Sequence, residues 1–152
     1  MKRLFCGLIA VMLMFALVSC GSQTTQIDKN ALASHILQNV SFAEQLEEID
    51  SEYAVSLFYL DPESCSAVCF NSSAAVADTL TIFEANDESY VSVINEAVNE
   101  KIDYLKEGYS DYGPAEVPKI ENAVVITEGR FVVFCICPDS GAAEKVIQDF
   151  IK

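Results

Sequence analysis

The feature that most constrains the fold is a change of hydrophobic period that occurs twice along the chain. Two short segments with the alternation or β-branched composition of strands precede a segment with helical spacing, and the same order then returns. The predicted strands span residues 65–70, 79–85, 123–127 and 130–137, and the helices that follow each pair span residues 86–108 and 139–151. Because antiparallel strands can be joined by short connections, this order predicts an antiparallel sheet covered by helices.

Two further helices precede the first predicted strand. One begins after Asp28, a suitable N-cap, and covers residues 28–40. The other is capped by Asp50 or Ser51 and ends before Pro62, because a residue that precedes proline avoids the helical conformation.

These segments predict one α+β domain at residues 28–152, with the element order ααββαββα. Its architecture is predicted to be an antiparallel four-stranded sheet packed against helices on one face. Residues 109–122 are predicted to form an ordered loop because they contain one glycine and two prolines. Glu128 and Gly129 are predicted to form the tight turn between the last two strands.

The start of the chain has the pattern of an export signal. Lys2 and Arg3 are followed by an apolar run at residues 4–16, and small residues precede Cys20. This pattern resembles a bacterial lipoprotein signal. The resemblance implies that a diacylglyceryl group, with fatty acyl chains such as palmitate, is attached to the Cys20 thiol. It also implies cleavage between Ser19 and Cys20.

The chain is therefore predicted to have three parts. Residues 1–19 are the signal peptide, residues 20–27 are the lipidated cysteine and a flexible tether, and residues 28–152 are the domain. A transmembrane anchor is the first alternative, but the whole apolar run, residues 4–18, has about 15 residues and is shorter than the about 20 that a span needs. A cleaved secretory signal without lipid is the second alternative.

The mature chain is strongly acidic. The whole sequence has 9 Lys and Arg against 23 Asp and Glu, so the loss of Lys2 and Arg3 leaves a net charge of −16. Nucleic acid is an unfavourable partner for such a surface, because binding to phosphates depends on Lys and Arg. Anionic lipid headgroups are unfavourable for the same reason. Contact with the membrane is therefore predicted through the lipid anchor only.

Several short motifs in the second half of the chain carry a wider resemblance. They are Tyr112-Gly113-Pro114 with Glu116, Lys119-Ile120-Glu121-Asn122, Gly129-Arg130-Phe131 and Pro138-Asp139. With the lipidated cysteine and a long acidic helix, they resemble an uncharacterised family of small lipoproteins from Gram-positive anaerobic bacteria, a domain of unknown function. The resemblance implies a location on the outer leaflet of the cytoplasmic membrane, facing the cell exterior. It brings no catalytic or binding residues, and the strand cysteines depart from it.

Four cysteines lie in the predicted strands, at Cys65, Cys69, Cys135 and Cys137. Within each pair the spacing along a strand is unfavourable for a disulfide, so only a bridge across strands, from Cys69 to Cys135 or Cys137, is open. A zinc site and a redox dithiol are weaker alternatives, because the spacings lack a knuckle turn and no activating cation is adjacent. The pattern favours small buried apolar residues.

One segment is a candidate ligand loop. Tyr104, Tyr109 and Tyr112 alternate with acidic residues, and such a set can bind a sugar or a cation, or can cover one end of the core. The single histidine, His35, has no second histidine with which to share a metal, and no calcium loop, phosphate loop or nucleophile motif is present in the sequence. No catalytic residue, metal or cofactor is predicted.

Two functions are compatible with these observations. The first is a membrane-anchored extracytoplasmic lipoprotein that acts as a non-enzymatic binding module for a protein or glycan partner in the envelope. The second is a cell-envelope hydrolase that uses acidic residues or a metal held by cysteines.

Overall fold

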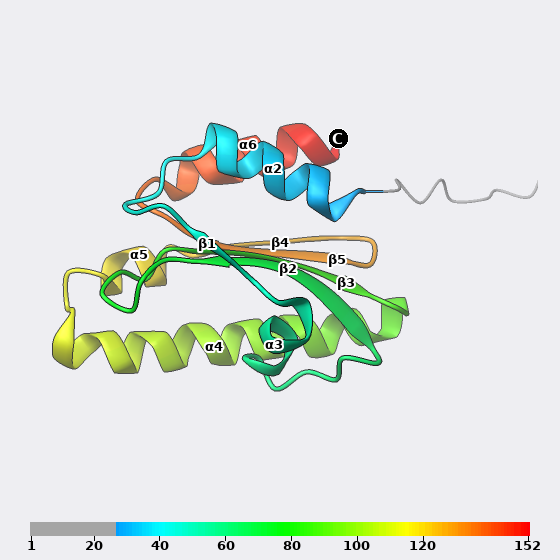
Figure 1. Cartoon of the computed structure of the whole chain (residues 1–152), viewed down its shortest axis with the longest axis horizontal. Helices are drawn as coiled ribbons and strands as arrows, with labels where there is room; N and C mark the ends of the chain where they lie inside the picture. Colours follow the sequence, from blue (N-terminus) through cyan, green and yellow to red (C-terminus); the bar gives the residue numbers. More distant parts are fainter. Residues whose placement is uncertain (1–26) are drawn as a thin grey trace, which may run out of the picture.

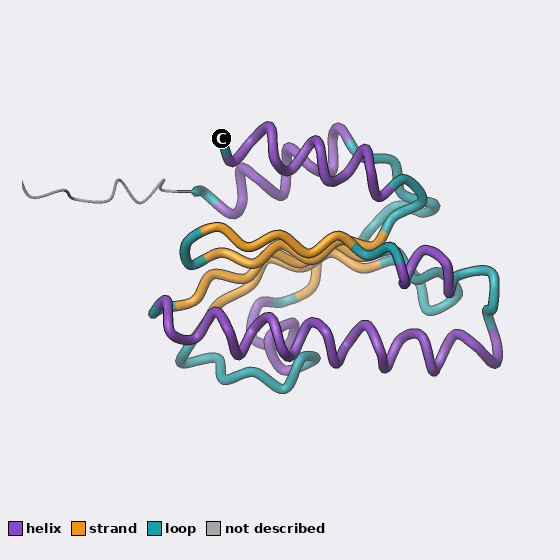
Figure 2. The backbone as a smooth tube through the Cα atoms, turned by 180° about the vertical axis from the view of Figure 1, so that it is seen from behind, coloured by secondary structure: helices purple, strands orange, loops and turns teal. Residues whose placement is uncertain are grey.

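The computed structural model describes residues 27–152. The predicted signal peptide, Ser19, Cys20 and the tether up to residue 26 lie outside the described residues. The described part forms three layers, in which one five-stranded sheet lies between two layers of helices (Figure 1). The view from behind shows the same arrangement, with the longest helix on one side of the sheet and a pair of helices on the other (Figure 2).

The sheet is antiparallel throughout, with the strand order β1-β2-β3-β5-β4. The strands are β1 (Glu47–Ile49), β2 (Cys65–Asn71), β3 (Thr79–Ala85), β4 (Val124–Glu128) and β5 (Phe131–Ile136). The two-residue loop between β4 and β5 begins with Gly129, whose φ of 53° is the left-handed conformation that glycine adopts without steric cost.

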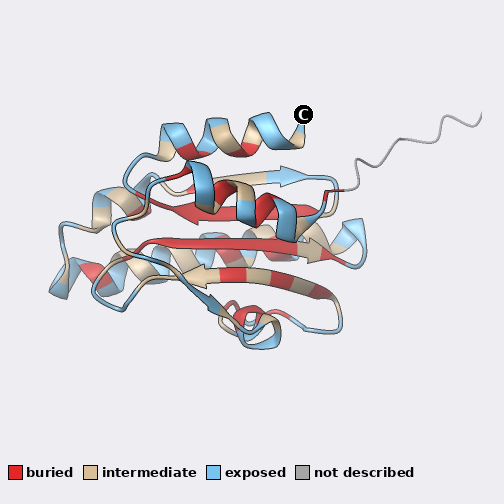
Figure 3. Cartoon of the chain, turned by 45° about the horizontal axis from the view of Figure 1, so that its top comes forward, coloured by how far each residue is buried: buried red, intermediate tan, exposed pale blue. Residues whose placement is uncertain are grey.

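Each face of the sheet has its own layer of helices and its own hydrophobic core. The helices are α2 (Lys29–Asn39), α3 (Ser51–Ser56), α4 (Val91–Tyr112), α5 (Val117–Glu121) and α6 (Ser140–Ile151), with a short 3-10 helix η1 (Glu88–Tyr90) before α4. Helices α3, α4 and α5 pack on one face, and α2 and α6 pack on the other. The central strands are almost wholly buried, whereas the outer faces of the helices are exposed (Figure 3).

The predicted α+β class and the single antiparallel sheet are confirmed, but the prediction of four strands with helices on one face is wrong. A fifth strand, β1, pairs with β2 at the edge of the sheet, and helices cover both faces. The physical reason is the composition of the two central strands. Strand β5 is buried at every position and β3 at every position except Glu84, so both faces of these strands require apolar cover.

Three of the helices begin at the predicted N-caps. The carboxylates of Asp28, Asp50 and Asp139 each accept a hydrogen bond from a backbone N–H two or three residues further along the chain. Ile27, the last residue of the predicted tether, is buried against the core beneath α2 and α6.

Helix α4 does not end at Gly108 as the spacing predicts, but continues to Tyr112. The extra turn places the ring of Tyr109 in the core, where it is 4% exposed. The predicted loop that follows contains a further short helix, α5, with Pro118 in its first turn, where its missing N–H has no intrahelical partner. Among the helices of residues 27–152, none is both long and apolar enough to span a membrane.

Candidate functional site

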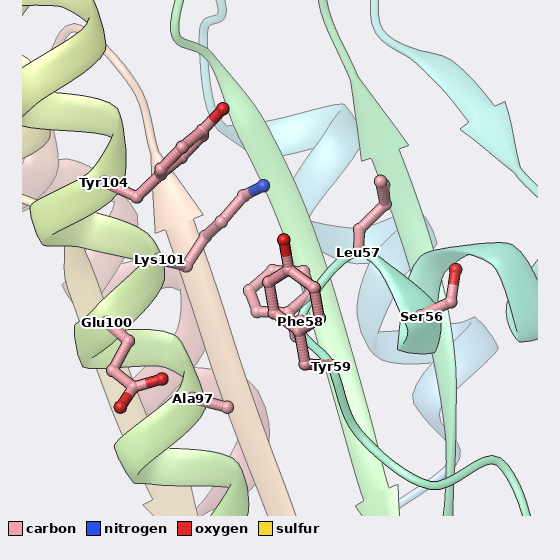
Figure 4. Close-up of a pocket in the computed structure, with 8 residues that line it drawn as sticks. All are labelled: Ser56, Leu57, Phe58, Tyr59, Ala97, Glu100, Lys101 and Tyr104. Carbon is pink, nitrogen blue, oxygen red and sulfur yellow. The ribbon is translucent and has the colours of Figure 1, made fainter.

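A cavity of about 410 Å³ opens between α4 and the turn that ends α3, and we call it the α3–α4 groove. It is lined by Ser56, Leu57, Phe58 and Tyr59 at the end of α3 and by Ala97, Glu100, Lys101 and Tyr104 on α4 (Figure 4). A mostly apolar and aromatic wall with a few charged groups is typical of small-molecule binding sites, which commonly enclose about 300 to 1,000 Å³.

The turn that forms the α3 side of the groove has an unusual residue at its centre. The N–H of Leu60 donates to the carbonyl of Val55 (3.3 Å) and the N–H of Tyr59 donates to the carbonyl of Ser56 (3.0 Å), the pattern of a Schellman motif. The central residue of this motif is left-handed and usually glycine, but here it is Tyr59, with φ of 56°. That conformation costs about 1 to 2 kcal/mol for a residue with a Cβ atom.

Burial of the ring does not offset this strain, because Tyr59 is 97% exposed. Strained residues that do not pack in the core are concentrated at binding and catalytic sites. The position of Tyr59 beside the cavity therefore marks the α3–α4 groove as the leading candidate site among the described residues.

Phe58 forms the rigid base of the groove. Its ring contacts Phe83 of β3 and Phe134 of β5 edge to face, with centroids 4.9 Å and 5.9 Å apart. Aromatic pairs in this geometry gain about 0.5 to 1.5 kcal/mol beyond the burial of their surface. The base of the groove is thus fixed directly to the two central strands of the sheet.

Lys101 is the cation of the groove. Its Nζ lies 5.6 Å from the centroid of the Phe58 ring and 5.3 Å from that of Tyr104. No carboxylate within residues 27–152 forms an ion pair with it, although this chain has 23 acidic residues. Burial lowers the pKa of the Lys101 amine from its usual value, and the nearby Cys69 thiol opposes that effect. The faces of these two rings are the cation–π partners of the Lys101 amine in the described residues.

Glu100 is the acid of the groove and does not neutralise Lys101. Adjacent residues on a helix point about 100° apart and do not face each other. Figure 4 shows the Glu100 carboxylate turned away from the side on which Lys101 and Tyr104 project. A second, smaller cavity of about 170 Å³ shares Leu57, Phe58 and Lys101 with the groove, so these side chains separate the two spaces.

The three tyrosines predicted to form a ligand loop lie on helix α4, and only Tyr109 and Tyr112 are brought together. Tyr104 lines the groove and is 69% exposed. Tyr109 is buried and its hydroxyl donates to the carbonyl of Ala74 (3.2 Å), while the ring of Tyr112 lies 4.9 Å from that of Tyr109. Tyr109 and Tyr112 therefore cover one end of the core, and only Tyr104 belongs to the candidate site.

A second cluster of charged groups has the contacts of a structural cluster and not of a binding site. Asp78 and Glu116 both bind the amine of Lys119, and Glu116 also accepts a hydrogen bond from the N–H of Ala77 (2.9 Å). The second oxygen of Asp78 accepts from the N–H of Ala43 (2.6 Å). The two carboxylates thus share one cation, and each accepts a further hydrogen bond from a backbone N–H, so both are tied into the fold.

The four strand cysteines lie on opposite faces of the sheet. Cys65 and Cys69 pack in the core under α3 and α4, whereas Cys135 and Cys137 pack in the core under α2 and α6. The bridge from Cys69 to Cys135 or Cys137 is therefore geometrically excluded, and all four are free and buried. Within residues 27–152, no three Cys, His, Asp or Glu side chains lie together in a way that could hold a metal ion.

The sequence prediction missed Phe58, Tyr59 and Lys101. One signal for Lys101 was available, because it lies three residues before Tyr104 on a predicted helix and so shares its face. Nothing in the local sequence marks Tyr59 as left-handed, since glycine is the residue by which such a turn is normally recognised.

The geometry thus defines a three-layer α+β domain with one candidate groove on its α4 face. Residues 38–137 match the family model described as Domain of unknown function (DUF4358), so the chain belongs to this family. The matched segment includes the whole α3–α4 groove and all five strands, but excludes α6 and nearly all of α2. No curated protein and no solved structure matches the chain significantly.

Proposed function

We propose that the protein is a membrane-anchored extracytoplasmic lipoprotein whose domain acts as a non-enzymatic binding module, with the α3–α4 groove as its binding site. The proposal of an anchor is supported by the lipoprotein-type sequence that ends at Cys20. The proposal of a binding module is carried by one observation, the Lys101 amine held over two aromatic rings without a carboxylate partner in the described domain.

Binding is favoured over catalysis by the state of the titratable groups. The carboxylates of Asp78 and Glu116 share Lys119, and Glu100 is the one acidic residue that lines the groove. General acid–base hydrolysis of a glycan needs two carboxyl groups that face a common substrate. The groove instead offers a cation, aromatic surface and an apolar base, which are the components of a recognition site.

The test is photo-crosslinking in the cells that produce the protein. A photoreactive phenylalanine analogue is placed at Tyr59, and the same analogue is placed at Tyr112, which is also an exposed tyrosine but lies at the far end of α4. After irradiation, intact-mass measurement of the purified protein is expected to show a defined adduct at position 59 and none at position 112. Equal or absent adducts at the two positions would contradict the proposal.

A further inference from the structure

The charges that line the α3–α4 groove indicate the chemical class of its ligand. This inference rests on the proposed function, because it names the chemical class that the same groove recognises. The starting observation is the contrast between one unpaired cation inside the groove and a chain whose net charge is −14.

The partial burial of the Lys101 amine indicates which kind of ligand group would stabilise it. A half-buried amine loses part of its hydration, which is why burial lowers its pKa. Contacts with ring faces return only about 0.5 to 2 kcal/mol to such a cation. Hydrogen bonds between an amine and a carboxylate are among the strongest in proteins, and no carboxylate of residues 27–152 reaches this one.

The other residues that line the groove indicate the shape, charge and size of the rest of the ligand. Phe58, which is 6% exposed, gives the apolar base, and the accessible aromatic surface comes from the exposed rings of Tyr59 and Tyr104. These rings suit an aromatic or otherwise flat apolar body. Glu100 lines the same cavity on the side away from Lys101 and would repel a second negative charge there. The volume of about 410 Å³ suits a small molecule rather than a folded partner.

We propose that the α3–α4 groove binds a small organic monocarboxylate with a flat apolar body, whose carboxylate accepts hydrogen bonds from Lys101 Nζ and whose body lies on Phe58 between Tyr59 and Tyr104 (Figure 4). Selectivity is set at two points: Lys101 requires one carboxylate, and Glu100 disfavours a second.

The probes are 3-phenylpropionate, its neutral amide and the dicarboxylate phenylsuccinate. The protein is purified as the cells produce it, held in phosphatidylcholine nanodiscs, and titrated by calorimetry and by saturation-transfer NMR. The acid is expected to bind at least about tenfold more tightly than the amide, the difference expected from one charge-assisted hydrogen bond. The dicarboxylate is expected to bind more weakly than the acid.

Three variants assign the effect to Lys101. K101M keeps the apolar stem and is expected to lose the preference for the acid while still binding the amide, and K101R is expected to restore the preference. K145M is the matched control, because Lys145 is an exposed lysine on α6, on the opposite face of the sheet, with no ion pair in the described domain. Circular dichroism confirms that each variant is folded.

The outcomes separate this inference from the proposed function. Equal affinity for acid and amide would overturn the inference and leave the groove as a binding site without anion recognition. A preference for the acid that survives in K101M would also overturn it. Failure of every probe to bind would overturn it too, whereas the photo-crosslinking result at Tyr59 decides the proposed function independently.

Discussion

The amine of Lys119 lies 2.7 Å from Oδ1 of Asp78, a carboxylate side chain with no exposed surface. This pair joins α5 to the loop between β2 and β3, and the second oxygen of Asp78 holds the backbone at Ala43, beyond the end of α2. Three segments that are distant in sequence therefore meet at one buried charge.

Removal of this charge is expected to destabilise the domain strongly. D78N leaves Lys119 partly buried with only Glu116 as partner, and breaking a buried pair costs about 3 to 5 kcal/mol. The free energy of unfolding from urea titration measures the loss. D103N is the matched control, because Asp103 is 82% exposed in its pair with Lys106 and such surface pairs contribute about 0 to 1 kcal/mol. Similar losses in the two variants would contradict the structural role of Asp78.

The same cluster predicts how stability depends on pH. Burial alone would raise the pKa of Glu116, but hydrogen bonds from Ala77 and Lys119 lower it below its usual value. Burial would lower the pKa of Lys119, but its bonds to Asp78 and Glu116 raise it. Glu116 therefore binds its proton more weakly in the folded chain than in the unfolded chain, and its contribution to stability is lost as the pH falls through its folded pKa.

The contribution of Lys119 has the opposite sign. It is fully present below the unfolded pKa of lysine and is lost as the pH rises through the raised folded value. Unfolding free energies measured across the pH range are expected to fall at both ends. E116Q is expected to flatten the acid limb relative to D103N. An acid limb of unchanged slope would show that other carboxylates whose pKa values are lowered, such as Asp61 and Asp87, are responsible.

Replacement of Tyr59 by glycine is expected to stabilise the domain. Y59G removes the left-handed strain and should stabilise the domain by about 1 kcal/mol, because glycine adopts this conformation freely. Y53G is the matched control: Tyr53 is an exposed tyrosine inside α3, and glycine at that position should destabilise by about 0.5 to 1 kcal/mol. Thermal unfolding compares the two, and a destabilised Y59G would show that the strain of Tyr59 is offset elsewhere in the fold.

The four strand cysteines are expected to be reduced and unreactive in the folded protein. Burial raises the pKa of Cys65 and Cys69, and the neighbouring Cys137 thiol together with burial raises that of Cys135. The hydrogen bond with Cys135 lowers the pKa of Cys137, but that side chain is only 3% exposed and so is protected from reagents. Alkylation with iodoacetamide should therefore be slow in native buffer and should reach all four sites in denaturant. Mass spectrometry after digestion counts the labelled sites, and a bridged peptide from Cys69 to Cys135 would contradict the strand register.

The proposed anchor predicts a separate phenotype. C20A is expected to remain unprocessed and to lose the lipid, because the thiol of Cys20 is the proposed lipid acceptor and Cys20 directly follows the predicted cleavage site. Labelling with radioactive palmitate and membrane fractionation measure the two effects. C6A is the control, since Cys6 lies within the apolar run of the predicted signal, and palmitate labelling that persists in C20A would contradict the anchor.

Much of the local structure could be predicted from the sequence. Strand β3 spans the predicted residues 79–85, and three helices begin at predicted aspartate caps, because alternation and capping act over a few neighbouring residues. Strand β1 could not be predicted, since Glu47–Ile49 has only three residues and no alternation, and it exists because β2 offers an unpaired edge.

The second layer of helices could have been predicted. The run Phe131–Ile136 is apolar at every position, which is the pattern of a strand buried on both faces, and the prediction of helices on one face overlooked it. The groove is a different case. Phe58 lies in the turn after α3 and Lys101 lies on α4, with strands β2 and β3 between them in the sequence, so only the packed structure shows that they meet.

The chain before residue 27 joins the domain at α2, on the face of the sheet opposite the α3–α4 groove. A tether of residues 20–26, about 23 to 25 Å long if extended, would therefore attach on the α2 and α6 side of the domain. The α3–α4 groove, on the opposite face of the sheet, would stay clear of that attachment. Anchorage and recognition could then be altered independently, each through its own layer of helices.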